Sequence, residues 1–134
     1  MQTLEQTHLE LIKSLLSAFS RGDIEAVRNL LSEDVRLHFP GNNALSGEYR
    51  GRDRALEALA RSMQWTGGTT RVQMHDVLAN ETHGVLLYNV RARRGDRSIE
   101  YRYIDLYHFR EGQICEIYGY PAEDPAAFDA FYSE

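Results

Sequence analysis

The sequence has little of several features that mark specialised classes of protein. It contains one cysteine among 134 residues, and no apolar run is long enough to cross a bilayer. The single Cys115 excludes an internal disulfide framework and a thiolate cluster, and no histidines stand at the spacing typical of metal ligands. Residues Met1 to Glu10 lack the basic and apolar regions of a secretion signal. We therefore expect a cytoplasmic protein without a bound metal or a membrane partner.

An excess of positive charge is also missing. The formal net charge is -5, so attraction to nucleic-acid phosphates would need a local basic patch, and we expect no nucleic-acid partner. No glycine-rich phosphate loop or nucleophile motif occurs, and we expect no cofactor. The hydrophobic fraction of 43% is ordinary for a globular protein, and no segment has the composition of a linker. The length then predicts one domain over residues 1–134.

Apolar residues recur at helical spacing in the first half of the chain. This periodicity predicts helices from Leu4 to Ser20, from Ile24 through Leu31 behind the cap residue Asp23, and from Arg52 to just before Gly67-Gly68. Between the second and third helices, Val35, Leu37 and Phe39 alternate with polar residues, which predicts a strand that ends at Pro40.

The second half of the chain is rich in β-branched and aromatic residues. Short turn signals divide it into four predicted strands, Thr69 to Ala79, Val85 to Arg93, Arg97 to Phe109 and Gln113 to Tyr120, and a closing helix follows from Ala126 to Tyr132. Antiparallel hairpins are the simplest connection between these strands. The expected fold is α+β, with helices that cover the concave face of a strongly curved antiparallel sheet.

The turn at Gly95-Asp96 sets the pairing of the two long strands. A two-residue turn there places Arg94 opposite Arg97 and, counting back, Leu86 opposite Asp105. The residues that then share the interior face of the sheet are Leu86, Tyr88, Val90, Tyr101, Tyr103 and Asp105.

The turn after the third of these strands allows two registers. A three-residue turn, Arg110-Glu111-Gly112, avoids a positive φ at Glu111 and sends Ile117 inward and Tyr118 outward. A two-residue turn would instead make Tyr118 a neighbour of Asp105. The three-residue turn leaves an apolar outer face, which suggests a homodimer formed through that face. The residues of this face are Leu87, Ile104, Leu106, Tyr118 and Tyr120.

Asp105 is the most informative residue, because it lies between Ile104 and Leu106 with tyrosines two residues away on both sides. Burial disfavours the charged form of a carboxyl group, so Asp105 is a candidate hydrogen-bond donor to a ligand or a catalytic acid or base. The structural alternative is a carboxylate held by Arg102, a tyrosine hydroxyl or backbone amides.

Other residues on the interior face are candidates for contact with a small organic ligand. Flat apolar walls with a few hydroxyls are typical of small-molecule pockets, although the same side chains can simply fill a core. These candidates are Tyr88, Tyr101, Tyr103, Phe39, Leu86 and Ile117. His38, next to Phe39, is a second candidate catalytic residue, but strand alternation directs its ring outward unless the chain turns early at Pro40.

Five segments of the chain carry a family resemblance. DVRLHFPG (34–41) and LSGEYRGRD (45–53) resemble the SnoaL-like proteins of the nuclear-transport-factor-like superfamily. GDIEAV (22–27), ID (104–105) and FREGQI (109–114) also resemble the ketosteroid isomerases. The resemblance covers nearly the whole chain and implies a cone-shaped, cystatin-like fold, commonly dimeric through the outer side of the sheet.

The catalytic residues of the ketosteroid isomerases carry over only in part. The position of their catalytic base is Phe39 here, and the position of the tyrosine of their first helix falls near Leu15. Asp105 alone matches, at the protonated carboxyl of their oxyanion hole. Steroid isomerisation by that scheme is therefore not implied.

Two hypotheses follow. The first is a protein that binds a small, largely apolar molecule with an oxygen function and transfers protons as an isomerase or cyclase-like enzyme, with Asp105 as donor or acid/base. The second is a non-catalytic ligand-binding or dimerisation module in which Asp105 is structural.

Overall fold

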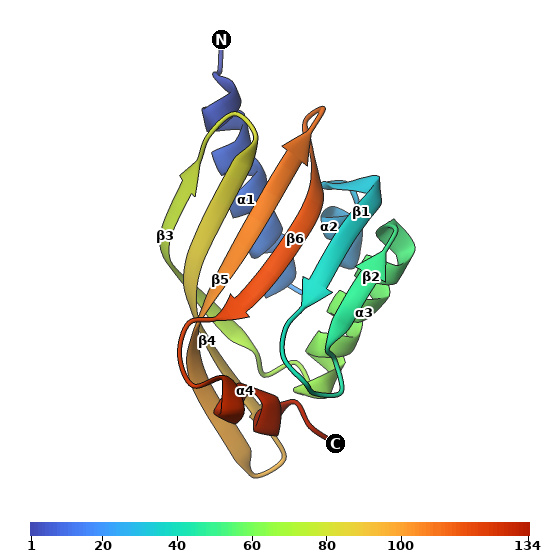
Figure 1. The fold of residues 1–134 in the computed structure, drawn as a ribbon, viewed down its shortest axis with the longest axis vertical. Helices are drawn as coiled ribbons and strands as arrows, with labels where there is room; N and C mark the ends of the chain where they lie inside the picture. Colours follow the sequence, from blue (N-terminus) through green and yellow to red (C-terminus); the bar gives the residue numbers. More distant parts are fainter.

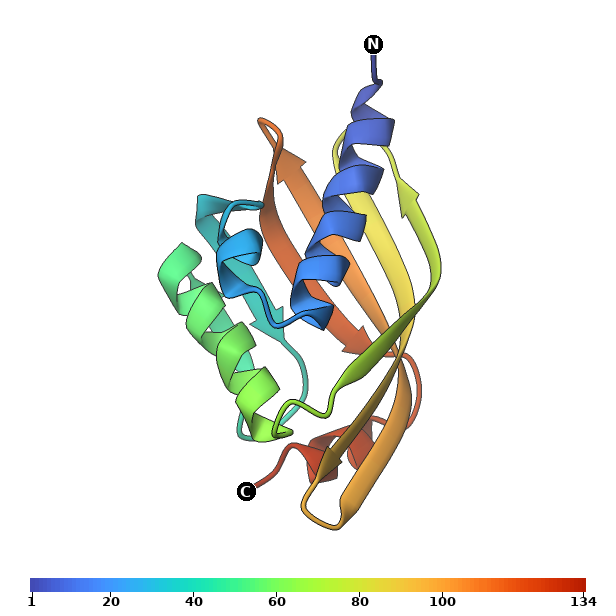
Figure 2. The same cartoon turned by 180° about the vertical axis from the view of Figure 1, so that it is seen from behind.

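The chain consists of four helices and one six-stranded sheet in a computed structural model that describes residues 1–134. Helices α1, α2 and α3 lie over one face of the curved sheet, as Figure 2 shows from behind. This confirms the α+β class and the helix-covered curved sheet. No helix is long and apolar enough to span a membrane. In chain order the elements are α1 (Leu4–Ser20), α2 (Ile24–Arg28), β1 (Leu31–Phe39), β2 (Gly47–Arg50), α3 (Arg52–Trp65), β3 (Arg71–Ala79), β4 (His83–Arg94), β5 (Arg97–Arg110), β6 (Gln113–Pro121) and α4 (Pro125–Phe131).

The strand order is β2-β1-β6-β5-β4-β3, so the last strand of the chain lies in the middle of the sheet beside the first (Figure 1). The β1–β6 pair is parallel, whereas all other pairs are antiparallel. The expectation of an entirely antiparallel sheet was therefore wrong for one pair. The long intervening chain between β1 and β6 permits the crossover that a parallel pair requires.

Helix boundaries depend on local caps as well as on apolar spacing. Helix α1 has the predicted bounds, and Thr3 and Gln6 form a capping box at its start. Helix α2 ends at Arg28, so the predicted continuation through Leu31 was wrong, because Leu31 is the fully buried first residue of β1. The short edge strand β2 was not predicted, since its four residues are mostly exposed and carry no apolar alternation.

The β4–β5 hairpin has the predicted register. Arg94 pairs with Arg97 across the turn, and Leu86 pairs with Asp105 further along. Gly95 adopts a φ of +65°, which glycine tolerates without steric strain.

The side chains of β6 point to the predicted faces of the sheet, but the turn between β5 and β6 differs from the predicted one. The loop has two residues, with positive φ at both Glu111 and Gly112, so the three-residue turn was wrong. A bulge at Cys115 adds one residue to β6 between the partners of Phe109 and His108. The extra residue shifts the register by one, so Gly119 pairs with Asp105, and Tyr118 lies on the outer face as predicted.

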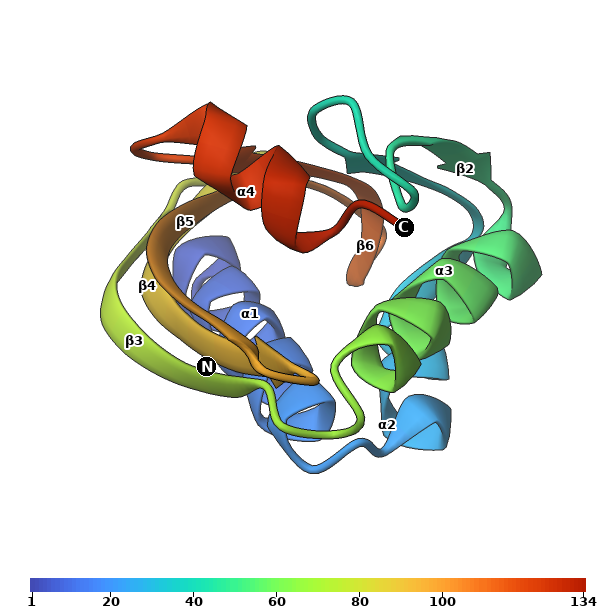
Figure 3. The same cartoon turned by 90° about the horizontal axis from the view of Figure 1, so that it is seen from below.

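Two apolar clusters make up the interior. The larger one joins α1, α3 and the sheet around Ile12, Val35 and Tyr107. The smaller one joins α4 to the β4–β5 hairpin around Phe128 and includes Tyr103. In the view from below, Figure 3 shows α4 at the end of the sheet that carries the β4–β5 hairpin.

Candidate functional site

A cavity lies between the helices and the concave face of the sheet. The space open to the centre of a water-sized sphere is about 100 Å³. One water molecule needs ~10–15 Å³ by this measure, so the cavity has room for a small organic ligand. Fourteen of the nineteen lining residues are hydrophobic, and no lysine or arginine is among them, so the walls favour an uncharged, largely apolar molecule. The lining residues are Leu15, Leu16, Phe19, Leu37, His38, Phe39, Leu59, Ser62, Thr70, Val72, Tyr88, Val90, Tyr101, Tyr103, Asp105, Tyr107, Ile117, Gly119 and Tyr132.

The carboxyl group of Asp105 is bound through one oxygen only. The hydroxyl of Tyr107 donates a hydrogen bond to Asp105 Oδ2 at 2.7 Å, and the hydroxyl of Tyr88 donates to the same atom at 3.1 Å. No protein group donates a hydrogen bond to Oδ1. The only side-chain nitrogen or oxygen that is fully buried without a partner is Trp65 Nε1, so Oδ1 is not fully buried. Because Asp105 lines the cavity, Oδ1 is the carboxyl oxygen available to a ligand.

Burial controls the charge of this carboxyl group. Removal from water raises the pKa of Asp105 to about 6, and the hydrogen bonds from Tyr107 and Tyr88 oppose this rise. No arginine, lysine or histidine contributes to the shift. The Asp105 side chain is therefore mainly ionised at pH 7, yet it binds a proton more tightly than an ordinary aspartate does.

Five tyrosines surround the cavity, and all of them remain protonated near neutral pH. Burial raises the pKa of Tyr88, Tyr101, Tyr103 and Tyr107 well above the usual value, and it also raises the pKa of Tyr132. The hydroxyls of Tyr101 and Tyr132 bind each other at 2.7 Å, which connects the sheet to the residue that follows α4.

The structure brings most of the predicted ligand-contacting residues together. Tyr88, Tyr101, Tyr103, Phe39 and Ile117 all line the cavity with Asp105. Their functional roles stay predictions, but their shared location agrees with the register derived from the β4–β5 turn.

Two predicted site residues do not fit the cavity in the expected way. Leu86 is 1% exposed in the larger core cluster and is not among the residues that line the cavity, so the structure places it apart from the other candidates for ligand contact. His38 borders the cavity, but its ring lies 5.5 Å from that of Tyr118 on the outer face. Strand alternation in β1 therefore turns the imidazole away from Asp105, as the pattern of Val35, Leu37 and Phe39 indicated.

Sequence reasoning did not assign Tyr107 or Tyr132 to the site. Tyr107 lies two residues after Asp105 on the same strand face, so strand alternation was an available signal. Tyr132 reaches the cavity only because α4 folds back on β5, which no local pattern indicates. Leu15 and Phe19 also line the cavity, and they do so because α1 packs against the sheet, which no local pattern indicates.

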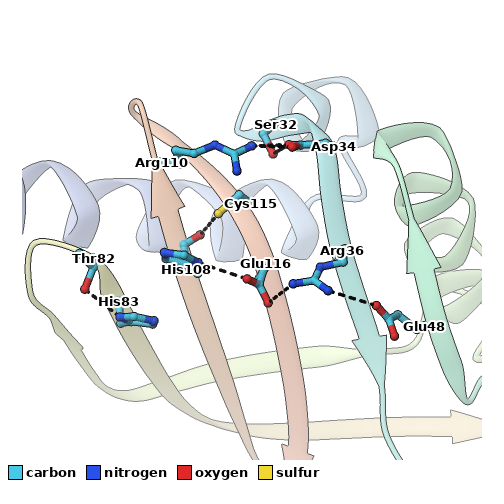
Figure 4. Close-up of polar contacts among 10 residues, drawn as sticks. All are labelled: Ser32, Asp34, Arg36, Glu48, Thr82, His83, His108, Arg110, Cys115 and Glu116. Atoms are coloured by element: carbon cyan, nitrogen blue, oxygen red, sulfur yellow. Dashed lines mark hydrogen bonds and ion pairs between the residues drawn. The ribbon is translucent and has the colours of Figure 1, made fainter.

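A second group of titratable side chains lies on the outer face of the sheet (Figure 4). The rings of His83 and His108 stack at 4.7 Å, His108 contacts Glu116 at 3.2 Å, and Glu116 pairs with Arg36 at 3.1 Å. Burial opposes ionisation of Glu116, but the contacts with His108, Tyr118 and Arg36 hold its pKa below the usual range. No group of histidines, cysteines and carboxylates has the arrangement of a metal site.

Comparison with known proteins agrees with this architecture. An uncharacterized protein of Mycobacterium tuberculosis is 31% identical over 130 residues, which are 96% of this chain and 98% of that protein. The solved structure of Bal32a, from a soil-derived mobile gene cassette, has a TM-score of 0.92 at 22% identity and covers 97% of this chain and 99% of Bal32a. A candidate SnoaL-like polyketide cyclase from Jannaschia has a TM-score of 0.83 at 14% identity, covering 99% of this chain and 96% of its own.

The cavity enclosed by a curved sheet and the matches over nearly the full chain point to one family. The model of the SnoaL-like domain matches residues 12–117. The chain therefore belongs to the SnoaL-like domain family.

Proposed function

We propose that this protein is an isomerase or cyclase-like enzyme that transfers a proton on a small, largely apolar, oxygen-bearing molecule, with Asp105 as the acid/base. The observation that carries the proposal is the free Oδ1 atom of a carboxyl group in a largely apolar cavity. One oxygen of this buried carboxyl group accepts hydrogen bonds from the protein and the other is free, which suits the group to proton transfer.

The electrostatics of Asp105 support a role as base in the resting protein. A catalytic base works best when its pKa is close to the working pH, because it is then both ionised and strongly basic. The pKa of about 6 meets this condition near neutral pH. Tyr107 and Tyr88 hold the carboxyl group in one orientation through Oδ2.

The family supports the class of reaction without naming a substrate. A structurally similar protein from Jannaschia is described as a candidate SnoaL-like polyketide cyclase, which supports the cyclase-like class for this chain. Proton transfer at carbon needs one well-placed acid/base group and no cofactor, which suits a cavity with a single ionisable carboxyl group.

The first test is hydrogen exchange on a panel of cyclic ketones in D₂O, followed by mass spectrometry. A base in the cavity should catalyse deuterium uptake at the carbon next to the carbonyl group for those ketones that fit. The exchange rate should rise with pH through about 6 and then level off, because Asp105 must be ionised to take the proton. Asp105→Asn should lower the rate by ~100-fold or more.

Asp96→Asn provides the matched control, since Asp96 is exposed in the β4–β5 turn and remote from the cavity lining. It should exchange the ketones at the wild-type rate. Equal rates in wild type and Asp105→Asn would remove the catalytic role and leave the alternative of a non-catalytic ligand-binding module.

A further inference from the structure

One cavity hydroxyl has no partner in the protein. Tyr88 and Tyr107 donate to Asp105, and Tyr101 and Tyr132 bind each other. The remaining cavity tyrosine, Tyr103, makes no hydrogen bond through its hydroxyl group. Its hydroxyl oxygen is also not one of the fully buried polar atoms that lack a partner. A buried hydroxyl normally has a partner, so a free one that opens into a cavity is a candidate ligand contact.

The ring of Tyr103 is held beside Asp105 by its surroundings. Tyr103 stands two residues before Asp105 on the same face of β5 and stacks on Phe128 of α4 at 5.8 Å. Its hydroxyl end lies over Gly119, the cross-strand partner of Asp105, where any Cβ atom would collide with the phenol. Burial is the main cause of the raised pKa of the Tyr103 hydroxyl, and the negative charge of Asp105 is the second cause.

We infer that Tyr103 donates a hydrogen bond to the carbonyl oxygen of the ligand while Oδ1 of Asp105 takes a proton from the neighbouring carbon. This assignment rests on the proposed proton-transfer function and specifies its substrate class. The substrate is a neutral carbonyl compound with an acidic C–H bond next to the carbonyl group or conjugated with it. Donor and base lie on one face of one strand, so both reach the same end of the ligand.

The reaction step balances without a further reactant. The C–H bond breaks, its proton forms an O–H bond with Asp105 Oδ1, and its electron pair gives an enolate whose oxygen accepts the hydrogen bond from Tyr103. Return of the proton from Asp105 to the same carbon restores the substrate, and return to a different carbon gives an isomer. In D₂O the protonated carboxyl group exchanges with solvent, which accounts for deuterium uptake.

Other ligand classes fit the two groups less well. An anionic ligand would meet the charge of Asp105 in a cavity that no arginine or lysine lines. An ammonium group could pair with Asp105 but has no lone pair to accept a hydrogen bond from Tyr103. A carbonyl compound satisfies both the free donor and the free carboxyl oxygen.

The first experiment measures exchange of the ketone panel by Tyr103→Phe. Loss of one donor to a developing oxyanion typically lowers the turnover rate by ~100-fold or more, and the pH dependence set by Asp105 should persist. Tyr120→Phe is the matched control, since Tyr120 is exposed on the outer face of β6 and should leave the exchange rate unchanged. An exchange rate in Tyr103→Phe equal to that of wild type would overturn the assignment.

The second experiment separates this inference from the proposed function. The infrared carbonyl stretch of bound indan-2-one should shift to lower frequency in wild type and in Asp105→Asn, but not in Tyr103→Phe. That pattern without any catalysed exchange would support the Tyr103 contact while removing the proton-transfer function. Exchange that depends on Asp105, together with a stretch that is the same in wild type and Tyr103→Phe, would refute the Tyr103 contact alone. The absence of a bound carbonyl signal in wild type would overturn the assigned substrate class.

Discussion

The carboxyl group of Asp105 links the chemistry of the cavity to the stability of the fold. Its pKa in the folded chain is about 6, above the ordinary value of 3.8, so the folded state holds this proton more tightly than the unfolded state does. Stability is therefore greatest below pH 3.8 for this group and declines as the pH rises through about 6. The loss amounts to about 3 kcal/mol once Asp105 is fully ionised.

Asp105→Asn should accordingly stabilise the protein above pH 6. Asparagine keeps an oxygen that accepts from Tyr107 and Tyr88 but carries no charge to desolvate. We expect the free energy of unfolding in urea to exceed that of wild type by ~1–3 kcal/mol at pH 8, with a smaller difference at pH 4. A difference between the two proteins that is the same at pH 4 and pH 8 would contradict a desolvated carboxyl group at this position.

At the scale of single elements, β6 shapes the site although it contributes no charged group to it. Its bulge at Cys115 shifts the register so that Gly119 lies opposite Asp105, and Gly119 leaves room for the ring of Tyr103. The hydroxyl of Tyr103 can lie at the proposed ligand position because Gly119, the residue of β6 beneath it, has no side chain.

Gly119→Ala should displace Tyr103 and lower ketone exchange to the level of Tyr103→Phe. The added methyl group collides with the phenol, and overpacking of this kind costs ~1–3 kcal/mol of stability. The loss of stability can be checked by thermal unfolding in a double-mutant cycle with Tyr103→Ser, which removes the ring. If Gly119→Ala destabilises the Tyr103→Ser protein as much as wild type, the collision with the phenol is not its cause.

At the scale of the whole molecule, the outer face of the sheet is divided into polar and apolar rows. Leu78, Val85, Leu106 and Tyr118 are successive cross-strand partners over four strands. Leu87, Ile104 and Tyr120 form a second apolar row beside them. A polar row of His83, His108, Glu116 and Arg36 borders the first. Leu78, Leu106 and Tyr120 are 54%, 36% and 44% exposed, so this chain alone leaves an apolar band in water.

The homodimer expected through the outer face stays a prediction. Leu106→Lys places a charge in the centre of the apolar band and should raise the dissociation constant of the dimer by about tenfold or more. Leu4→Lys is a control of the same chemistry, because Leu4 is 55% exposed at the start of α1. Sedimentation velocity over a range of concentrations gives the mass of each variant. A monomer in the wild type at every concentration would contradict a dimer through this face.

Local patterns predicted much of the fold and part of the site. Turn chemistry at Gly95-Asp96 gave the pairing of Leu86 with Asp105, because a two-residue hairpin has only one register. The bulge at Cys115 was not predictable in the same way, since a bulge depends on how neighbouring strands twist and pack. The end of α2 and the start of β1 at Leu31 were misjudged because a buried leucine suits either element.

The amino-acid sequence by itself determined the helices, most of the strands and the face on which Asp105 and its flanking tyrosines lie, because these follow from local periodicity and turn geometry. Only the tertiary structure decided which of these residues share a cavity, that Leu86 is outside it, and that Tyr132 of the C-terminal segment completes it. It also decided that Oδ1 of Asp105 and the hydroxyl of Tyr103 remain free. The physical reason is that hydrogen-bond pairing and desolvation depend on groups distant in the sequence, which only the folded chain brings together.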